Sequence, residues 1–322
     1  MADHPALPDA PLLLVLVRCN EPYATVVQQL RAARLPYIIY QKEGGMCNKR
    51  RLPESEAASS RLIPFNLGRE CVGYVKFISD YYHELPRMTA FLQWEAEMHM
   101  PLRGHGLPAN VAFLRNVSSG YVALSKNVFE GPWPAPCEPA KSIPAFASCS
   151  ASYWQEAASA GAQAGAPPPD RVRFYANGMF AASADRIRRH PRAFYRRLLA
   201  RFSGRTPLRC VDGNVFRPFH NRNASGVVRS EVDCLVLEKL WHVLLGEPPM
   251  MPPPAEYDQL RFPPSYLATV GSLPGASRKR VARPLTGQQT CAPNCDWAGK
   301  CWSEAHNRKL VESGEAARRS ER

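Results

Sequence analysis

The sequence lacks any apolar run of the roughly 18 residues that a membrane-spanning helix needs. The one candidate targeting segment is Pro11–Val17, but no Lys or Arg precedes it and no small-x-small cleavage pattern follows. We therefore interpret it as a buried strand. The expected location is cytoplasmic by default, and the secretory pathway stays open if the N-terminus is truncated.

A tight cysteine framework is also missing, because the 10 cysteines are scattered through the chain. This scatter predicts mostly reduced, buried thiols, as in a cytosolic protein. One group near the end of the chain could bind zinc through three thiolates and an imidazole: Cys291, Cys295, Cys301 and His306. Its spacings differ from those of common zinc fingers, so free or oxidised thiols are the alternative.

The 31 prolines are unevenly placed and divide the chain. We expect a flexible N-terminus over residues 1–11 and one α/β domain over residues 12–246. Within that domain, the Pro-, Ala- and Gly-rich residues 131–170 are expected to form an exposed insertion. Residues 247–322 are too polar and too rich in proline to build a core, which predicts a disordered basic tail.

Strand and helix patterns alternate in the front half. Apolar runs of strand length occur at Leu12–Val17, Tyr37–Tyr40, Leu62–Phe65 and Met88–Leu92, and residues 68–82 have helical spacing. A helix is also expected after Asn20-Glu21-Pro22, and later ones from Ser183, from Pro191 and over Val232–Leu245. This order predicts an open, mainly parallel sheet flanked by helices.

Polar residues follow three of these predicted strands. Arg18, Asn20 and Glu21 follow the first strand, and Lys42 follows the second. The third strand leads into a helix through a glycine-containing segment, in which we single out Asn66, Gly68, Arg69 and Glu70. Ligands of open parallel sheets bind beyond the carboxyl ends of strands, and a helix N-terminus favours an anion. The alternative is a capped helix start with a local Arg–Glu pair.

The fourth strand ends at Gln93 and is followed by Glu95 and Glu97. Two carboxylates at this spacing could bind Mn²⁺ or Mg²⁺ bridging a diphosphate. The alternative is a solvated acidic turn.

The net charge of +13 is concentrated between Arg171 and Arg222, which contains 13 arginines and no lysine. Such a window indicates either an anionic partner or a solvated face. Few aromatic residues are interleaved, and no nucleic-acid-binding motif is visible.

With these motifs in view, the chain resembles an uncharacterised eukaryotic domain family, found in fungi and algae, over about residues 12–246. The resemblance is carried by an ordered series: Val17-Arg18-Cys19-Asn20-Glu21, Tyr40-Gln41-Lys42-Glu43-Gly44, Asn66-Leu67-Gly68-Arg69-Glu70, Phe91-Leu92-Gln93, Gly178-Met179-Phe180 and Leu237-Glu238-Lys239-Leu240-Trp241-His242.

The layout of that family is similar to glycosyltransferases with one nucleotide-binding α/β domain. The resemblance implies that Asn20, Glu21, Lys42 and Arg69 contact the nucleotide of a sugar donor. It further implies that Gly178 shapes the acceptor side and that Glu238 is a general base. The chain departs from such enzymes at Gln93-Trp94, where an Asp-x-Asp metal motif is usual. The competing hypothesis is a non-catalytic binder of a polyanion through the arginine-rich window.

Overall fold

A six-stranded, mostly parallel sheet forms the centre of the computed structural model, which describes residues 7–44, 47, 52–64, 68–102, 104–133, 149–155, 167–203, 229–253, 262–266, 268 and 289–290. The strand order is β3-β2-β1-β4-β8-β5. Four neighbouring strands are parallel, namely β3 (Ser60–Ile63), β2 (Tyr37–Lys42), β1 (Leu12–Arg18) and β4 (Met88–Gln93). The predicted α/β fold with a mainly parallel sheet is therefore confirmed.

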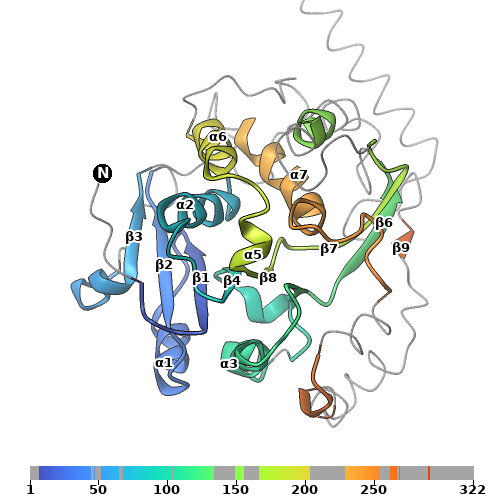
Figure 1. Cartoon of the computed structure of the whole chain (residues 1–322). Helices are drawn as coiled ribbons and strands as arrows, with labels where there is room; N and C mark the ends of the chain where they lie inside the picture. Colours follow the sequence, from blue (N-terminus) through green and yellow to red (C-terminus); the bar gives the residue numbers. More distant parts are fainter. Residues whose placement is uncertain are drawn as a thin grey trace, which may run out of the picture.

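The two antiparallel strands beyond β4 come from later parts of the chain. β8 (Phe180–Ser183) runs antiparallel to β4, and β5 (Tyr121–Ala123) runs antiparallel to β8. A second, small sheet consists of β7 (Arg171–Tyr175), β6 (Val128–Pro132) and β9 (Gln289–Thr290). Figure 1 shows this second sheet to one side of the large one.

Helices cover both faces of the large sheet (Figure 1). The chain passes from β1 to β2 through α1 (Ala24–Ala32) and returns from β3 to β4 through α2 (Cys71–Tyr81). Because both crossovers follow the right-handed rule and run in opposite directions, the two helices lie on opposite faces. α3 (Leu107–Val111) packs beside α1, whereas α6 (Arg192–Phe202) and α7 (Arg229–Leu244) pack beside α2.

Short helical turns complete the framework. η2 (Glu54–Ser59) precedes β3, η3 (Ala96–His99) follows β4, and η4 (Ala112–Arg115) follows α3. α5 (Ala184–Ile187) begins at Ser183, whose hydroxyl accepts a hydrogen bond from the backbone N–H of Arg186 at 3.3 Å, as the sequence predicts. None of the helices in the described residues is both long and apolar enough to span a bilayer.

Aromatic residues from four elements meet above β4 and β8. The ring of Tyr74 on α2 contacts Phe91, Phe180 and Trp241, and all four residues are almost completely buried. Burial of such rings is the main favourable term that holds α2 and α7 onto the sheet. The buried side chains of α7 lie on more than one of its faces and include Leu237, Leu240, Trp241 and Leu244.

Two regions differ from the sequence-based expectation. Residues 149–155, predicted to lie in an exposed insertion, form a helix whose Cys149, Tyr153 and Trp154 are buried in the main core. Parts of the predicted tail also pack on the domain, because Met251 is buried, β9 pairs with β6, and Phe262 contacts Phe113 edge to face. Proline content predicted irregular backbone here, but the aromatic and sulfur-containing side chains between the prolines still bury apolar surface.

The expectation of reduced thiols is wrong for the described cysteines. Cys19 is bonded to Cys47 and Cys71 to Cys234, Cys149 is also disulfide-bonded, and the described residues include no free cysteine. Spacing in the sequence says little about pairing across 163 residues, the separation of the second bond. The predicted zinc group, Cys291, Cys295, Cys301 and His306, lies outside the described residues.

Two buried titratable groups on α7 should give opposite pH dependences of stability. Burial lowers the pKa of His242 from 6.5 to about 4, and burial raises the pKa of Asp233 from 3.8 to about 6. Protonation of unfolded His242 costs stability as the pH falls from 6.5 to 4, whereas proton uptake by native Asp233 adds stability over nearly the same range. Each contribution is on the order of 3 kcal/mol.

Urea unfolding between pH 6 and pH 4 tests this balance. We expect the wild type to vary little, His242→Gln to gain stability as the pH falls, and Asp233→Asn to lose it. Parallel curves for all three proteins would show that neither group titrates as stated.

Candidate functional site

The carboxyl edge of the large sheet contains a topological switch point. From β1 the chain first builds β2 and β3 on one side and then returns to form β4 on the other. In open α/β sheets such a point opens a crevice in which ligands bind. Because β8 is antiparallel to β4, it begins at this same edge, directly after Asn177-Gly178.

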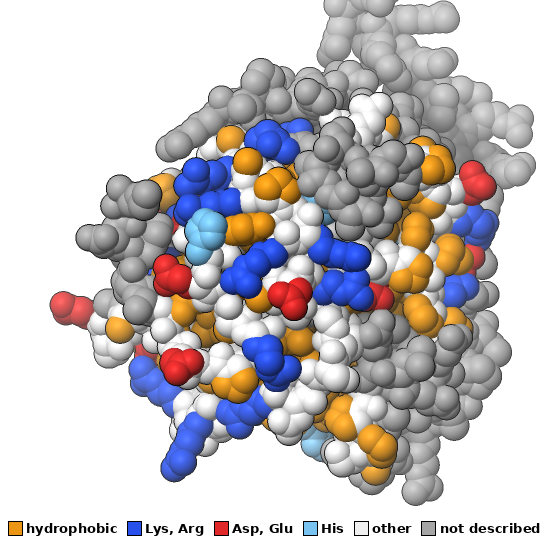
Figure 2. All heavy atoms as spheres, viewed as in Figure 1, with side chains coloured by type: hydrophobic (Ala, Val, Ile, Leu, Met, Phe, Trp, Pro, Cys, Tyr) orange, Lys and Arg blue, Asp and Glu red, His pale blue; other side chains and the backbone are white. Residues whose placement is uncertain are grey.

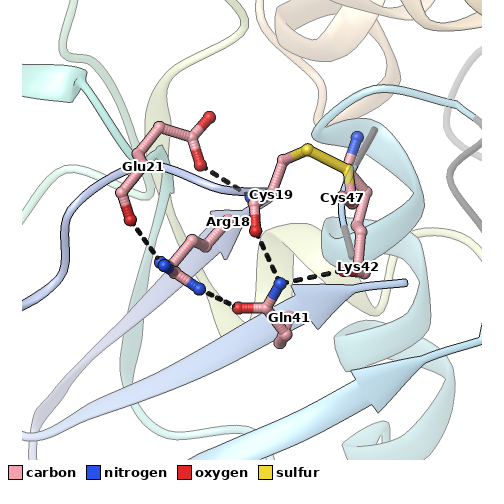
Figure 3. Close-up of a disulfide and its surroundings, with 6 residues drawn as sticks. All are labelled: Arg18, Cys19, Glu21, Gln41, Lys42 and Cys47. Atoms are coloured by element: carbon pink, nitrogen blue, oxygen red, sulfur yellow. Dashed lines mark hydrogen bonds between the residues drawn. A yellow bond between two sulfur atoms is a disulfide. The ribbon is translucent and has the colours of Figure 1, made fainter. Parts of the chain in front are cut away.

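The ends of β1 and β2 are joined by a hydrogen-bonded network around Arg18 (Figure 3). Its guanidinium donates to the Glu21 carbonyl at 2.7 Å and to the Gln41 side chain. The Gln41 amide in turn donates to the carbonyls of Cys19 at 2.6 Å and Lys42 at 2.8 Å. Arg18 is only 1% exposed, so its side chain holds the strand ends together from inside the protein and does not project from the edge.

The turn after β1 is fixed by three further contacts. The Glu21 carboxylate accepts from the Cys19 N–H at 2.7 Å, and the Cys19–Cys47 disulfide links the turn to the segment after β2. The Trp94 indole N–H donates to the Pro22 carbonyl at 2.7 Å, which joins the ends of β1 and β4. Asn20 is half-buried within this turn, and Lys42 is buried at the end of β2.

The N-terminus of α2 lies over the same edge. Gly73, in the first turn of α2, has no room for a side chain, because a Cβ there would lie 2.3 Å from Val17 Cγ2 and 3.3 Å from Tyr40 Cβ. Gly68 and Arg69 both have positive φ values, of 69° and 48°. Strained backbone of this kind occurs frequently at ligand-binding segments. Asn66, which the sequence predicts to contact the ligand, lies outside the described residues.

Three residues predicted separately meet at one point. A Cβ placed on Gly178 would lie 3.7 Å from Glu70 Oε1 and 3.6 Å from Glu238 Cγ. The φ of Gly178 is +56°, and its neighbour Asn177 donates its backbone N–H to Glu238 Oε1 at 2.5 Å. Arg69 Nε lies 3.8 Å from Glu70 Oε2. We call Glu70 and Glu238, with the Asn177-Gly178 turn between them, the carboxylate pair.

The electrostatics of the carboxylate pair make Glu238 a stronger base than an ordinary glutamate. Burial and the neighbouring Glu70 raise the pKa of Glu238, although the Asn177 N–H opposes this shift. Both carboxylates also contribute, after burial, to the raised pKa of the Tyr74 hydroxyl. A raised pKa makes a carboxylate a better proton acceptor in general base catalysis.

The two other predicted metal ligands, Glu95 and Glu97, lie in different surroundings. Glu97 Oε1 accepts the N–H groups of Gly104 at 2.8 Å and Gly106 at 3.0 Å, so this carboxylate closes a local loop. Glu95 is exposed and Gln93 is half-buried at the end of β4. The binding of a divalent cation by Glu95 and Glu97 stays a prediction.

Three of the arginines in the described part of the basic window hold helix ends. Arg186 donates to the carbonyls of Leu245 and Gly246 after α7, whereas Arg188 and Arg192 donate to carbonyls at the end of α2. Cationic donors at a helix C-terminus satisfy its last carbonyls and complement its dipole. On the face seen in Figure 2, Lys and Arg side chains are separated by acidic, apolar and uncharged groups.

A surface hollow of about 560 Å³ lies elsewhere, between α1 and η2. Its lining includes Arg31 and Glu56, which form an ion pair at 2.7 Å, and it contains none of the residues of the carboxylate pair. We therefore place the candidate site at the sheet edge, where polar groups from several strands and helices meet.

Sequence reasoning missed Gln41, Tyr74 and Asn177 as members of the site. Gln41 appears only within a longer motif, and its bridging role depends on the pairing of β1 with β2. Tyr74 follows Glu70 by one helical turn, which is a signal that becomes informative once the start of α2 is known.

Comparison with known proteins gives one family. No curated protein and no solved structure matches the chain. The sequence profile of an uncharacterised family matches residues 32–258, which contain β2, the carboxylate pair and all of α7. The chain therefore belongs to the family described as protein of unknown function (DUF3431).

Proposed function

We propose that this protein transfers a sugar from a nucleotide-activated donor to an acceptor hydroxyl at the carboxyl edge of its sheet. The observation that carries the proposal is the convergence of Glu70, Gly178 and Glu238 beside the switch point between β1 and β4. Open α/β sheets with such a switch point commonly bind nucleotides there, although the fold alone does not define the reaction.

The donor diphosphate would lie at the N-terminus of α2. The helix dipole and the partly exposed Arg69, which is 46% exposed, supply positive charge for a leaving diphosphate. Lys42 adds a second cation at the end of the neighbouring strand β2. The buried Arg18 network keeps the adjacent turn, with Asn20 and Glu21, in one conformation.

Glu238 would act on the acceptor. The acceptor oxygen bonds to the anomeric carbon, the bond from that carbon to the diphosphate oxygen breaks, and the diphosphate leaves with the electron pair. The hydroxyl proton passes to Glu238, and Gly178 leaves space because it has no side chain. Since Glu97 is engaged by two backbone N–H groups, we route no step through Mn²⁺ or Mg²⁺.

The disulfides indicate where such a reaction would occur. Disulfides persist mainly in oxidising compartments. We therefore infer maturation in an oxidising compartment rather than in the cytosol.

Calorimetric titration with nucleotide diphosphate sugars, with and without Mn²⁺, tests donor binding. We expect heat from at least one donor, and an affinity about 10- to 100-fold lower for Arg69→Ala, because a charge-assisted contact is lost. The matched control is Arg87→Ala, since Arg87 precedes β4 at the opposite edge of the sheet and should not affect binding.

Two results would contradict the proposal. One is the absence of heat with every donor. The other is equal binding by wild type, Arg69→Ala and Glu21→Ala. Strong binding to heparin that falls steeply with salt would instead favour the polyanion hypothesis.

A further inference from the structure

The Cys71–Cys234 disulfide joins the first residue of α2 to the second turn of α7. Both cysteines are fully buried, and their Cα atoms are 5.5 Å apart. The bond therefore fixes the distance between two helix segments that are far apart in the sequence.

Each cysteine lies close in sequence to one member of the carboxylate pair. Glu70 immediately precedes Cys71, and Glu238 follows Cys234 by four residues, about one helical turn. The same two carboxylates flank Gly178 at 3.7 Å and 3.6 Å, measured from a Cβ placed there. The disulfide therefore links the two chain segments that carry these carboxylates.

Noncovalent contacts also hold the two helices and the two carboxylates. Gly73 packs α2 against Val17, Trp241 packs the last turn of α7 near Phe180, and the Asn177 N–H donates to Glu238. Two carboxylates repel each other when both are ionised, and this repulsion acts to separate α2 from α7. A covalent bond next to both groups opposes that separation.

We propose that the Cys71–Cys234 disulfide is a positioning element of the site, which holds Glu70 and Glu238 against the Asn177-Gly178 turn. The carboxylate pair is then complete only in the oxidised protein. This inference rests on the proposed function where it assigns proton transfer to Glu238, whereas the geometry it describes is independent of the substrate. Reduction by an added dithiol would convert the disulfide into two thiols and oxidise the dithiol to its own disulfide.

The test compares two double variants that each remove one disulfide. Cys71→Ala/Cys234→Ala removes the proposed positioning bond. Cys19→Ala/Cys47→Ala is the matched control, because it removes the disulfide between the segments that follow β1 and β2. The readout is the titration of the Glu238 carboxyl carbon by NMR, assigned with Glu238→Gln. We expect the pKa of Glu238 to fall toward that of an ordinary glutamate in the first variant and to stay raised in the control.

A second measurement tests the proposal even if the Cys71→Ala/Cys234→Ala variant does not fold. Wild-type protein is reduced with a dithiol and then reoxidised, and the Glu238 signal should shift and return. An unchanged titration without the Cys71–Cys234 bond, in either experiment, would overturn the proposal. Donor binding is measured in parallel, so a restored titration without donor binding would contradict only the proposed function.

Discussion

Glu238→Gln should lower the rate of sugar transfer by about 10²- to 10⁴-fold while donor affinity stays unchanged. The amide has nearly the same shape as the carboxylate, and its oxygen can still accept the Asn177 N–H that Glu238 accepts at 2.5 Å. What the amide cannot do is take a proton from an acceptor. Steady-state kinetics and calorimetry on the same preparation separate the two effects.

The wild-type rate should also depend on pH. Because the pKa of Glu238 is raised by burial and by Glu70, the base loses activity as the pH falls toward that raised value. Glu84→Gln serves as the control, since Glu84 is exposed beyond the other end of α2. A Glu238→Gln protein with the wild-type rate would remove Glu238 from the mechanism.

Gly73→Leu should lower the free energy of unfolding by about 3 kcal/mol, because overpacking a filled core costs energy of that order. Even a single added carbon at position 73 would meet Val17 Cγ2 at 2.3 Å, and Val17 is a stiff, buried side chain in β1. The helix would have to move away from the strand ends, and Glu70 would move with it. Chemical denaturation measures the loss directly.

A double-mutant cycle isolates the contact. Gly73→Ala alone introduces the clash, and Val17→Ala removes the atoms that the new methyl group would meet. We expect the double variant to be more stable than the sum of the two single changes predicts. Simple additivity, or a Gly73→Leu protein as stable as the wild type, would show that α2 does not depend on this close approach.

The front half of the fold is predictable because its local signals agree. β1, β2 and β4 are continuous apolar runs, as parallel strands buried on both faces require. The sequence predicts that the last helix of the domain ends at Leu245, and Gly246, with a φ of +86°, directly follows this end of α7. The antiparallel strands β5 and β8 are short, and their addition to the sheet beyond β4 depends on long-range packing that no local pattern encodes.

The members of the site are predictable one at a time, but their arrangement is not. Glu70 is expected from the sequence at a nucleotide site, whereas the structure places it opposite Glu238, 168 residues further along the chain. That neighbourhood depends on the docking of α7 against α2 and on the Cys71–Cys234 bond. A single sequence carries no information on which of its cysteines lie close in space.

Buried aromatic residues explain the error over residues 131–170. Alanine, glycine and proline dominate this stretch, so its average composition resembles that of a linker. Tyr153 nevertheless donates its hydroxyl to buried Asp233 at 2.6 Å, and the Arg201 guanidinium lies 5.1 Å from the Tyr153 ring centroid. A few specific contacts therefore decide the position of a segment whose composition suggests none.

Hydrogen–deuterium exchange with and without a bound nucleotide sugar tests most directly whether the carboxyl edge is the working site. On donor addition we expect slower amide exchange in three separate segments: the turn after β1, the start of α2, and the Asn177-Gly178 turn. Exchange along α6, which carries several of the arginines, should stay unchanged. Protection confined to α6, or to the hollow beside α1, with none at the sheet edge, would contradict the account.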